Sequence, residues 1–488
     1  MKFNYSFFCA IVLVLFSFSC ALKTKQVENK KPNVLLLYMD DLRPQLHSYG
    51  ANMIQSPNID ALAASGVQFN NAYSNVAVCG ASRASMLTGI RPTKSIFLNY
   101  NTFVEQERSN AITLPQLFKN NGYTTISNGK IYHHLDDREG DWDEVWRPYA
   151  FDENDKNLAP TDYWQSLWKD YQLETNAKTY KETDNGPAYE AADVLDSVYI
   201  DGRMTQKVIR DIKKLSKSKQ PFFLTAGFIS PHLPFNAPKK YWNLYKRENI
   251  KQPYNNYVAK DAPKISISNW PEMRAYNGIP KEGQVSDSLA ITLIHGYYAT
   301  VSYVDALIGD IVTNLKAEGL YENTIIILVS DHGYNLQEHT QWAKFTSHKI
   351  SAHVPLIISS PKFRNKTTTE ALVELVDVYP TLAELCNLEM PKEQLEGESL
   401  IPVLKDATHK GKKYIFMKSG NGYTVKSNEF GYTEYRNNNG AIIATMLYDH
   451  LNDKDENVNL SNLPEYSEIV AEFQHILNTE FKSNLEGD

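Results

Sequence analysis

The sequence predicts an α/β fold: a large, mixed but mostly parallel sheet sandwiched by helices, with a small C-terminal α+β subdomain. Segments of helical periodicity, such as 291–315, alternate with short apolar runs, and this alternation is typical of a mostly parallel sheet. The apolar runs suit strands that are buried on both faces. They lie at 33–39, 123–127, 221–228, 324–329 and 354–358. Shorter β-like segments follow at 413–418, 430–435 and 441–448, before an amphipathic helix at 465–481.

Composition and charge fit a folded enzyme. The chain has 488 residues, of which 42% are hydrophobic and 22% are charged, as in ordinary globular proteins. This length allows about three domains, although α/β enzymes often form one large core with a smaller attachment. The formal net charge of −7 argues against a nucleic-acid-binding protein. A negatively charged substrate would therefore need a local cluster of basic residues.

The N-terminus has the features of an export signal. Lys2 is followed by an apolar run at 7–18 that is too short to span a membrane comfortably, and we expect residues 1–19 to be a signal peptide. Cys20 follows a serine as at the end of a bacterial lipobox, which makes it a candidate for lipidation; a cleaved soluble signal is the alternative. The polar residues 20–32 suit a tether. We therefore expect an exported protein, either periplasmic or anchored to the membrane as a lipoprotein.

Changes of composition divide the rest of the chain. We expect a catalytic domain at 33–405 and, after a polar run, a C-terminal subdomain at 406–488. Segments 132–191 and 236–283 are rich in polar and aromatic residues and have weak periodicity. Because long connections of this kind often carry function, we expect both to cross the active-site edge, where substrate selectivity usually resides.

Acidic residues follow two of the predicted strands. Asp40 and Asp41 come directly after the first apolar run, and Asp331 and His332 follow the fourth. Ligands of open α/β sheets collect outside the carboxyl ends of the strands, so these groups are expected at one edge. An Asp-Asp pair alone is more often a turn, but two such strand ends beside a nucleophile indicate a site for a hard divalent cation. Because His332 supplies nitrogen, Mg²⁺ and Mn²⁺ stay open beside Ca²⁺.

The segment that begins at Cys79 carries the most specific motif, C-x-A-S-R-x-x-x-L-T-G. Cys79 lies at the expected start of a helix, where free N–H groups and the dipole favour an anion. Alone, it would more often be a buried core cysteine. The motif resembles the signature of type I sulfatases, whose cysteine is oxidised after translation to formylglycine (3-oxoalanine). That aldehyde hydrates to a gem-diol, which is the nucleophile, and Arg83 would hold the diol.

A second segment contributes Lys130 and His133 and resembles the second sulfatase signature. Lys130 would neutralise sulfate oxygens and touch the diol, while His133 would accept the proton that lets the aldehyde re-form. His134 is a competing candidate for this base. Taken alone, a lysine or histidine here would be a solvated surface side chain.

His232 and Lys344 complete the predicted catalytic group. His232 lies between prolines beyond a buried strand, and the prolines fix the backbone and so aim the imidazole. We expect it to contact the ester oxygen and to protonate the leaving alcohol; a structural histidine in a rigid turn is the alternative. Lys344 would be a second cation on the sulfate, opposite Lys130. Several cations and a metal ion suit a doubly negative transition state better than a neutral pocket does.

Together these segments resemble the formylglycine sulfatases of the alkaline-phosphatase superfamily, most closely the iduronate-2-sulfatase-like branch. The spacing of Lys130 and His133 points to that branch, and the likeness extends to 56–60, 303–305, 375–382 and 447–449. It implies an alkaline-phosphatase-like fold, removal of sulfate from a carbohydrate, and a maturation enzyme that generates formylglycine from Cys79. It also implies a calcium ion held by Asp40, Asp41, Cys79, Asp331 and His332.

Two departures from the family bear on the substrate. Gln337 stands where the family often has glycine, and Ser230 replaces a basic residue that the human-type enzyme carries before its Pro-His. Without that charge, we expect fragments of sulfated polysaccharides such as ulvan in place of iduronate-2-sulfate, with host glycosaminoglycans as an alternative. Two other functions stay open: a formylglycine-dependent phosphonate or phosphodiester hydrolase, and an inactive lipoprotein that only holds sulfated glycans.

Overall fold

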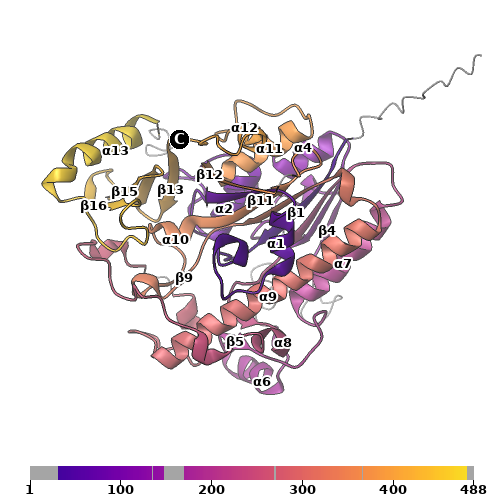
Figure 1. Ribbon diagram of the computed structural model, residues 1–488, viewed down its shortest axis with the longest axis horizontal. Helices are drawn as coiled ribbons and strands as arrows, with labels where there is room; N and C mark the ends of the chain where they lie inside the picture. Colours follow the sequence, from indigo (N-terminus) through magenta and orange to yellow (C-terminus); the bar gives the residue numbers. More distant parts are fainter. Residues whose placement is uncertain (1–30, 135, 148–169, 269–270, 365, 481–488) are drawn as a thin grey trace, which may run out of the picture. The chain divides into compact units, whose positions relative to one another are not determined.

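The predicted mixed, mostly parallel sheet is confirmed by the structure, a computed structural model that describes residues 31–134, 136–147, 170–268, 271–364 and 366–480. Its main sheet has eight strands in the order β12-β2-β11-β8-β1-β6-β3-β4 (Figure 1). Only β11 runs antiparallel to its neighbours, β2 and β8. The strands are β1 (Asn33–Met39), β2 (Val67–Tyr73), β3 (Thr124–Gly129), β4 (Glu144–Trp146), β6 (Phe222–Gly227), β8 (Thr324–Ser330), β11 (His353–Ser359) and β12 (Thr367–Glu374).

Strand β1 shows why the apolar runs are continuous. All seven of its residues are buried, because successive side chains enter two different cores. Leu35, Leu37 and Met39 pack on one side of the sheet, while Leu36 and Tyr38 pack on the other. An alternating polar pattern would suit only a sheet with one face in water.

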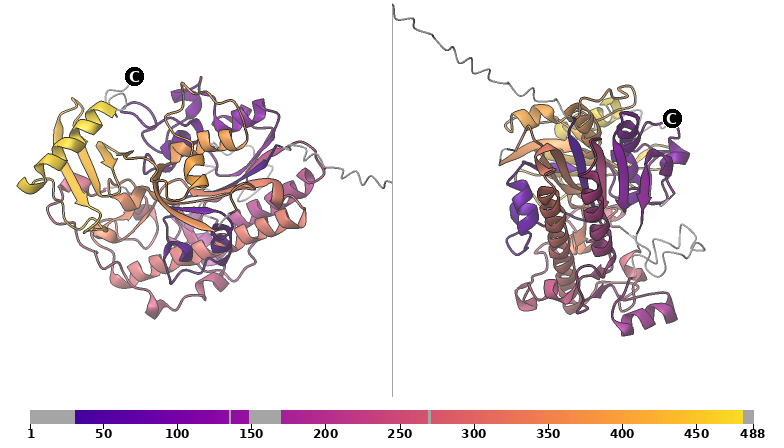
Figure 2. Two further views of the ribbon diagram at one scale, coloured as in Figure 1. Left: turned by 45° about the horizontal axis from the view of Figure 1, so that its top comes forward. Right: turned by 90° about the vertical axis from the view of Figure 1, so that its right-hand side faces the viewer.

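Helices cover both faces of this sheet. The first core is closed by α1 (Pro57–Ala63), α7 (Ile200–Leu215) and α9 (Asp287–Ala317), and the long helices α7 and α9 run side by side (Figure 2). The second core is closed by α2 (Cys79–Thr88), α4 (Leu114–Asn120), α11 (Val378–Leu385) and α12 (Ile401–Lys405). The remaining short elements lie in the connections: α3 (Val104–Glu107), β5 (Tyr189–Glu190), α6 (Glu174–Thr183), β7 (Phe235–Asn236), α8 (Lys239–Trp242), β9 (Asn335–Leu336), β10 (Trp342–Ala343) and α10 (Lys349–Ala352).

The C-terminal α+β subdomain has its own small core. An antiparallel sheet of β13 (Ile415–Ser419), β14 (Gly422–Lys426), β15 (Phe430–Arg436) and β16 (Ile442–Asp449) packs against α13 (Ser467–Glu480). Val425 and Tyr432 of the sheet meet Phe473 and Leu477 of the helix in this core. Strand β14 was not predicted, since it has only five residues and mixes apolar with polar side chains.

Several sequence predictions fall outside the described residues. These include the signal peptide at 1–19, Cys20 and most of the tether. Within the part of the chain that the structure describes, no helix combines the length and the hydropathy needed to cross a bilayer.

Candidate active site

The two acidic strand ends meet at the carboxyl edge of the sheet. In the parallel pair β1 and β8, Met39 lies opposite Ser330, so Asp40 and Asp331 leave the sheet side by side. The backbone N–H of Asp331 donates to Met39 O over 3.2 Å, and that of Asp41 donates to Asp331 Oδ1 over 3.2 Å. Asp40, Asp41 and Asp331 are all fully buried. The structure therefore brings together three carboxylates from two strands that are 290 residues apart in the chain.

Cys79 is the first residue of α2 and is buried, as every residue of this helix is. A side chain on the next residue, Gly80, would have its Cβ only 2.4 Å from the carbonyl oxygen of Tyr100, so glycine is required there. Ligand atoms of Cys79, Asp40, Asp331 and His332 all lie within 4.8 Å of one another. The predicted nucleophile thus lies at the acidic strand ends.

Arg83 lies one helical turn after Cys79 and joins three loops. Its Nε donates to Asp331 Oδ2 over 2.9 Å, and its other nitrogens donate to Met39 O (3.2 Å) and to the carbonyl oxygen of Lys130. Burial lowers its pKa, but Asp331 and Asp40 outweigh burial and raise it above the usual value. Most of its donors therefore hold protein groups together, while the expected contact with the diol stays a prediction.

Each predicted lysine meets one of the paired aspartates. Lys130 Nζ forms a buried ion pair with Asp40, and Lys344 Nζ lies 3.0 Å from both carboxylate oxygens of Asp41. Burial raises the pKa of Asp40, but Lys130 and His232 outweigh it and lower that pKa well below the usual range. These cations also provide the positive charge that an anionic substrate needs at this edge.

Glu272 was missed by sequence reasoning. Its carboxylate lies 3.0 Å from Lys344 Nζ and 2.7 Å from His232 Nε2. Burial raises its pKa, but Lys344 and His232 outweigh burial and lower it. The only sequence signal was its place in segment 236–283, which was expected to cross the active-site edge; no local motif marks the residue.

His232 is held at both nitrogens. Nδ1 lies 2.6 Å from the carbonyl oxygen of Leu233, and Nε2 makes an ion-pair contact of 2.7 Å with Glu272 Oε1, which favours an imidazole that carries two protons. Burial and Lys344 lower its pKa, but Asp41 and Glu272 outweigh them and raise it. The peptide bonds of Ser230-Pro231 and Leu233-Pro234 on either side are cis. The geometry suits a proton donor.

The pKa of His133 shifts in the opposite direction to that of His232. Burial and the neighbouring Lys130 lower its pKa well below the usual value, so the side chain is neutral and able to accept a proton. His134, the competing candidate, lies with Nε2 3.0 Å from the carbonyl oxygen of Tyr100 and stacks on Phe103 with ring centroids 3.8 Å apart. Because those contacts occupy His134, His133 fits the role of base better.

The donor set fits a divalent cation. Within the part of the chain that the structure describes, Asp40 Oδ1 and His332 Nε2 are buried without a hydrogen-bond partner, although buried polar atoms are rarely left so. Asp41 belongs to an overlapping group with Asp40 and His232. Burial lowers the pKa of His332, but Asp331 and Cys79 outweigh it and raise it to about 9, so cation binding would release this proton. The predicted ligand residues thus lie together.

Two of the family-specific positions also have a structural explanation. Gln337, where the family often has glycine, has a φ of 87°, a left-handed conformation that glycine adopts at little cost. Asp305 of α9 accepts hydrogen bonds from the backbone N–H groups of Asn58 (3.0 Å) and Ile59 (2.7 Å), which links segments 303–305 and 56–60.

Comparisons with known proteins agree with this architecture. The family model described as Sulfatase matches residues 32–388, and the model described as N-sulphoglucosamine sulphohydrolase, C-terminal, matches residues 337–483. Iduronate 2-sulfatase of Mus musculus is 33% identical over 423 residues, which cover 78% of this chain and 73% of that protein. A sulfatase of Formosa agariphila is 30% identical over 470 residues, covering 93% and 88%.

A solved structure shares the fold. The structure of BT4656 in complex with its substrate D-glucosamine-2-N,6-O-disulfate superposes with a TM-score of 0.73 at 22% identity, covering 94% of this chain and 99% of that one. The family match spans most of the chain and includes the Cys79 segment, both acidic strand ends and both lysines. The chain belongs to the sulfatase family and is a sulfuric ester hydrolase.

Proposed function

We propose that the protein removes sulfate from sulfated carbohydrates by means of a formylglycine that a maturation enzyme generates from Cys79. One observation carries the proposal: Cys79 begins a buried helix within 4.8 Å of ligand atoms of Asp40, Asp331 and His332. A helix N-terminus favours an anion, and Lys130 and Lys344 add two positive charges beside it.

The two histidines are suited to opposite proton transfers. His232, whose pKa is raised, would donate a proton to the ester oxygen as the bond from sulfur to that oxygen breaks. His133, whose pKa is lowered, would accept a proton when sulfate leaves and the aldehyde re-forms. Addition of water to the aldehyde then restores the diol without any net proton transfer. His133 returns its proton to solvent and His232 takes one up, while the proton that the diol hydroxyl loses on attacking sulfur leaves as the one net proton of ester hydrolysis.

Asp40, Asp41, Asp331 and His332, with the modified Cys79, would hold Ca²⁺, or else Mg²⁺ or Mn²⁺. A bound divalent cation offsets negative charge on sulfate oxygens and makes a coordinated hydroxyl more acidic. Lys130 and Lys344 would keep the sulfate oriented, and Arg83 would keep the three loops in register.

Polysaccharide fragments such as ulvan oligosaccharides are the proposed substrates, with glycosaminoglycans as the alternative. Beside His232, a small cavity of about 30 Å³ is lined by Ser230, Asp170 and Asp201. The described residues of this lining include no lysine or arginine, so a substrate carboxylate such as that of iduronate would meet no basic side chain there other than His232.

Mass spectrometry of the Cys79 peptide, combined with a sulfate-release assay on defined oligosaccharides, tests this proposal. We expect formylglycine in protein made with the maturation enzyme, and release of sulfate but not of phosphate from matched esters. Cys79→Ala should keep the fold, measured by circular dichroism, and lose at least about a thousandfold in turnover.

Faster turnover of phosphonate or phosphate esters would favour the phosphonate or phosphodiester hydrolase as the function. Glycan binding without sulfate release, despite a modified Cys79, would favour the glycan-holding lipoprotein.

We also propose that the protein is exported, with residues 1–19 as the signal and Cys20 as a lipidated anchor. The sequence around Cys20 supports this. Fractionation of a bacterial host should find the wild type with membranes, and Cys20→Ala in the soluble periplasmic fraction. Equal partition of the two proteins would contradict the anchor.

A further inference from the structure

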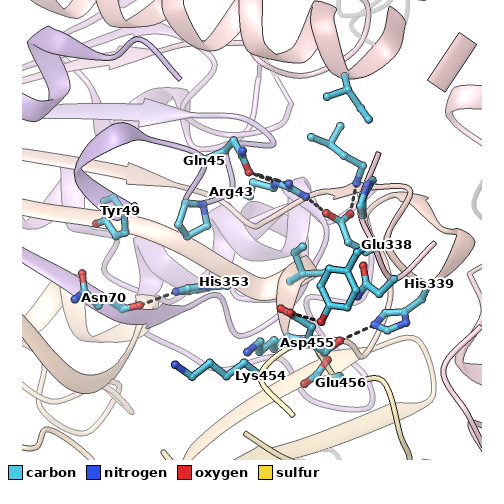
Figure 3. Close-up of a pocket in the computed structure, with 18 of the residues that line it drawn as sticks. Arg43, Gln45, Tyr49, Asn70, Glu338, His339, His353, Lys454, Asp455 and Glu456 are labelled. Atoms are coloured by element: carbon cyan, nitrogen blue, oxygen red, sulfur yellow. Dashed lines mark hydrogen bonds and ion pairs between the residues drawn. The ribbon is translucent and has the colours of Figure 1, made fainter. Parts of the chain in front are cut away.

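We propose that a second site, separate from the catalytic centre, binds a sulfated oligosaccharide and so anchors a polymeric substrate; the proposal rests on the carbohydrate substrate class given above. The site is a cavity of about 850 Å³, here called the anchor cavity (Figure 3). It is lined by segments 43–49, 251–255 and 454–456 and by the polar face of β2 and β12. Its volume lies within the range of about 300–1,000 Å³ that ligand sites usually have.

The anchor cavity lies behind the catalytic loops. Cys79, Lys130, His232 and Lys344 are absent from the described residues that line it. The wall between the two sites includes Arg43, whose backbone N–H donates to Tyr297 Oη over 3.0 Å, and Tyr297 in turn donates to the carbonyl oxygen of Asp41 over 2.8 Å. A ligand in the cavity would therefore lie near the catalytic edge without touching the reacting groups.

The carboxylates that line the cavity already have donors in the protein. Glu338 pairs with Arg43 over 2.7 Å, and Asp455 accepts the hydroxyl of Tyr254 over 2.6 Å. The other two behave in the same way: Glu370 accepts from Asn70 and Asn71, and Glu456 accepts from His348 and His450. Each of these carboxylates is thus held by at least one donor in the protein, and Arg43 also offsets the charge of Glu338.

The lysines of the cavity, unlike its carboxylates, have no such partner among the described residues. Among the residues that the structure describes, no carboxylate forms an ion pair with Lys251, Lys349 or Lys454, which come from three separate segments. Figure 3 shows Lys454 extended beside the hydrogen-bonded pair of Asn70 and His353. Each of these three ammonium groups can therefore pair with one negative group of a ligand, and their separation favours an extended ligand with several such groups.

The apolar lining suits sugar rings. Tyr49, Tyr254 and Tyr298 line the cavity, and the hydroxyls of Tyr49 and Tyr254 are bonded to the protein, which leaves their ring carbons as apolar surface. Tyr254 is 71% exposed. Aromatic surface with nearby ammonium groups and the side-chain amides of Gln45 and Gln252 offers contacts for a sugar ring, its sulfate groups and its hydroxyls. A sulfated oligosaccharide combines all three.

Calorimetry on the inactive Cys79→Ala protein tests the anchor cavity without consuming the ligand. The probes are a sulfated ulvan octasaccharide and its desulfated form. Adding Lys251→Ala and Lys454→Ala should weaken binding of the sulfated probe at least about tenfold, because two charge-assisted contacts are lost. The matched control is Lys217→Ala with Lys219→Ala, which removes the same charge from exposed positions just before β6, at the opposite edge of the sheet.

The same double substitutions in the active enzyme separate this proposal from the proposed function. The cavity variant should raise KM for the octasaccharide and leave turnover of 4-nitrophenyl sulfate unchanged. If the cavity and control variants lost affinity equally, the effect would be one of general electrostatics and the proposal would be wrong. Unchanged affinity in both variants would also contradict it. If the enzyme released no sulfate at all, calorimetry would still decide whether the cavity binds the probe.

Discussion

Two buried charge clusters in this protein have similar composition but differ in whether all their polar atoms have hydrogen-bond partners. The catalytic cluster contains Asp40, Asp41 and Asp331 with Arg83, Lys130 and Lys344. The structural cluster contains Glu374 and Asp377 with Arg91 and Lys412, between β12, α2 and the C-terminal subdomain. The carboxylates of both clusters are buried. Their difference lies in the atoms that are left without partners.

Every carboxylate oxygen of the structural cluster accepts a hydrogen bond. Glu374 Oε1 accepts from Asn75, Arg91 and the backbone N–H of Phe416, and Asp377 caps the same turn through the N–H of Glu374. Burial raises the pKa of Glu374, but Arg91 and Lys412 outweigh it and lower it to about 2. In the catalytic cluster, Asp40 Oδ1 and His332 Nε2 have no such partner among the described residues. A closed network supports the fold, whereas an incomplete one indicates where a ligand binds.

Lys344→Ala and Lys412→Ala should separate the clusters most strongly, since each lysine contacts two carboxylates. Lys412→Ala leaves the buried charge of Asp377 uncompensated, since Arg91 pairs with Glu374, and should lower the free energy of unfolding by about 3–5 kcal/mol. Lys344→Ala should reduce kcat by about 10²–10³ and destabilise the protein less, because His232 still faces Asp41. Urea denaturation and initial rates of sulfate release measure both effects. A folded Lys412→Ala enzyme with equally low kcat would remove the distinction.

Removal of the divalent cation should have the next-largest effect. Dialysis against a chelator should abolish activity and lower thermal stability, because an ion that binds only the folded state at a hundred times its Kd contributes about 2.7 kcal/mol. Re-addition of Ca²⁺, Mg²⁺ or Mn²⁺ in turn identifies the metal. Asp40→Asn should show no further response to the chelator. Full activity in protein shown by elemental analysis to be metal-free would contradict the site.

Glu272→Gln tests the residue that sequence reasoning missed. Glutamine can still accept a hydrogen bond from His232 but lacks the charge that favours the protonated imidazole. We expect kcat to fall about tenfold and the alkaline limb of the pH profile to move to lower pH, because His232 then loses its proton more readily. An unchanged pH profile with lower kcat would assign Glu272 a purely structural role.

The smallest effect is expected from substitution of Lys426, a buried cation that belongs to neither cluster. Its Nζ donates to the carbonyl oxygen of Ser427 over 2.8 Å, and burial lowers its pKa from 10.5 to about 7. The unfolded chain binds more protons between pH 7 and 10.5, so stability should rise with pH in that window. Lys426→Met should flatten the rise and stabilise the protein by about 1 kcal/mol at pH 7.5. Urea denaturation across this pH window checks it; an unchanged slope would mean that Lys426 stays charged when folded.

Strands were predictable where hydrophobicity alone determines them. Strand β1 matches its predicted bounds, and β8 differs by one residue, because both are mostly apolar and lie at the centre of the sheet. Strands β2 and β12 were not predicted. Their polar residues, such as Asn70 and Glu370, lie on a face that lines the anchor cavity, so neither strand shows a continuous apolar run.

The sequence by itself determined the sheet's central strands, the start of α2 at Cys79 and the acidic strand ends, because these depend on local hydrophobicity and short motifs. Only the tertiary structure decided that Glu272 reaches His232 and Lys344, and that the lysines of the anchor cavity face a common space. It also decided which buried carboxylates are fully hydrogen-bonded. These properties depend on which distant segments meet, and the energy of a buried charge is set by those neighbours rather than by its place in the chain.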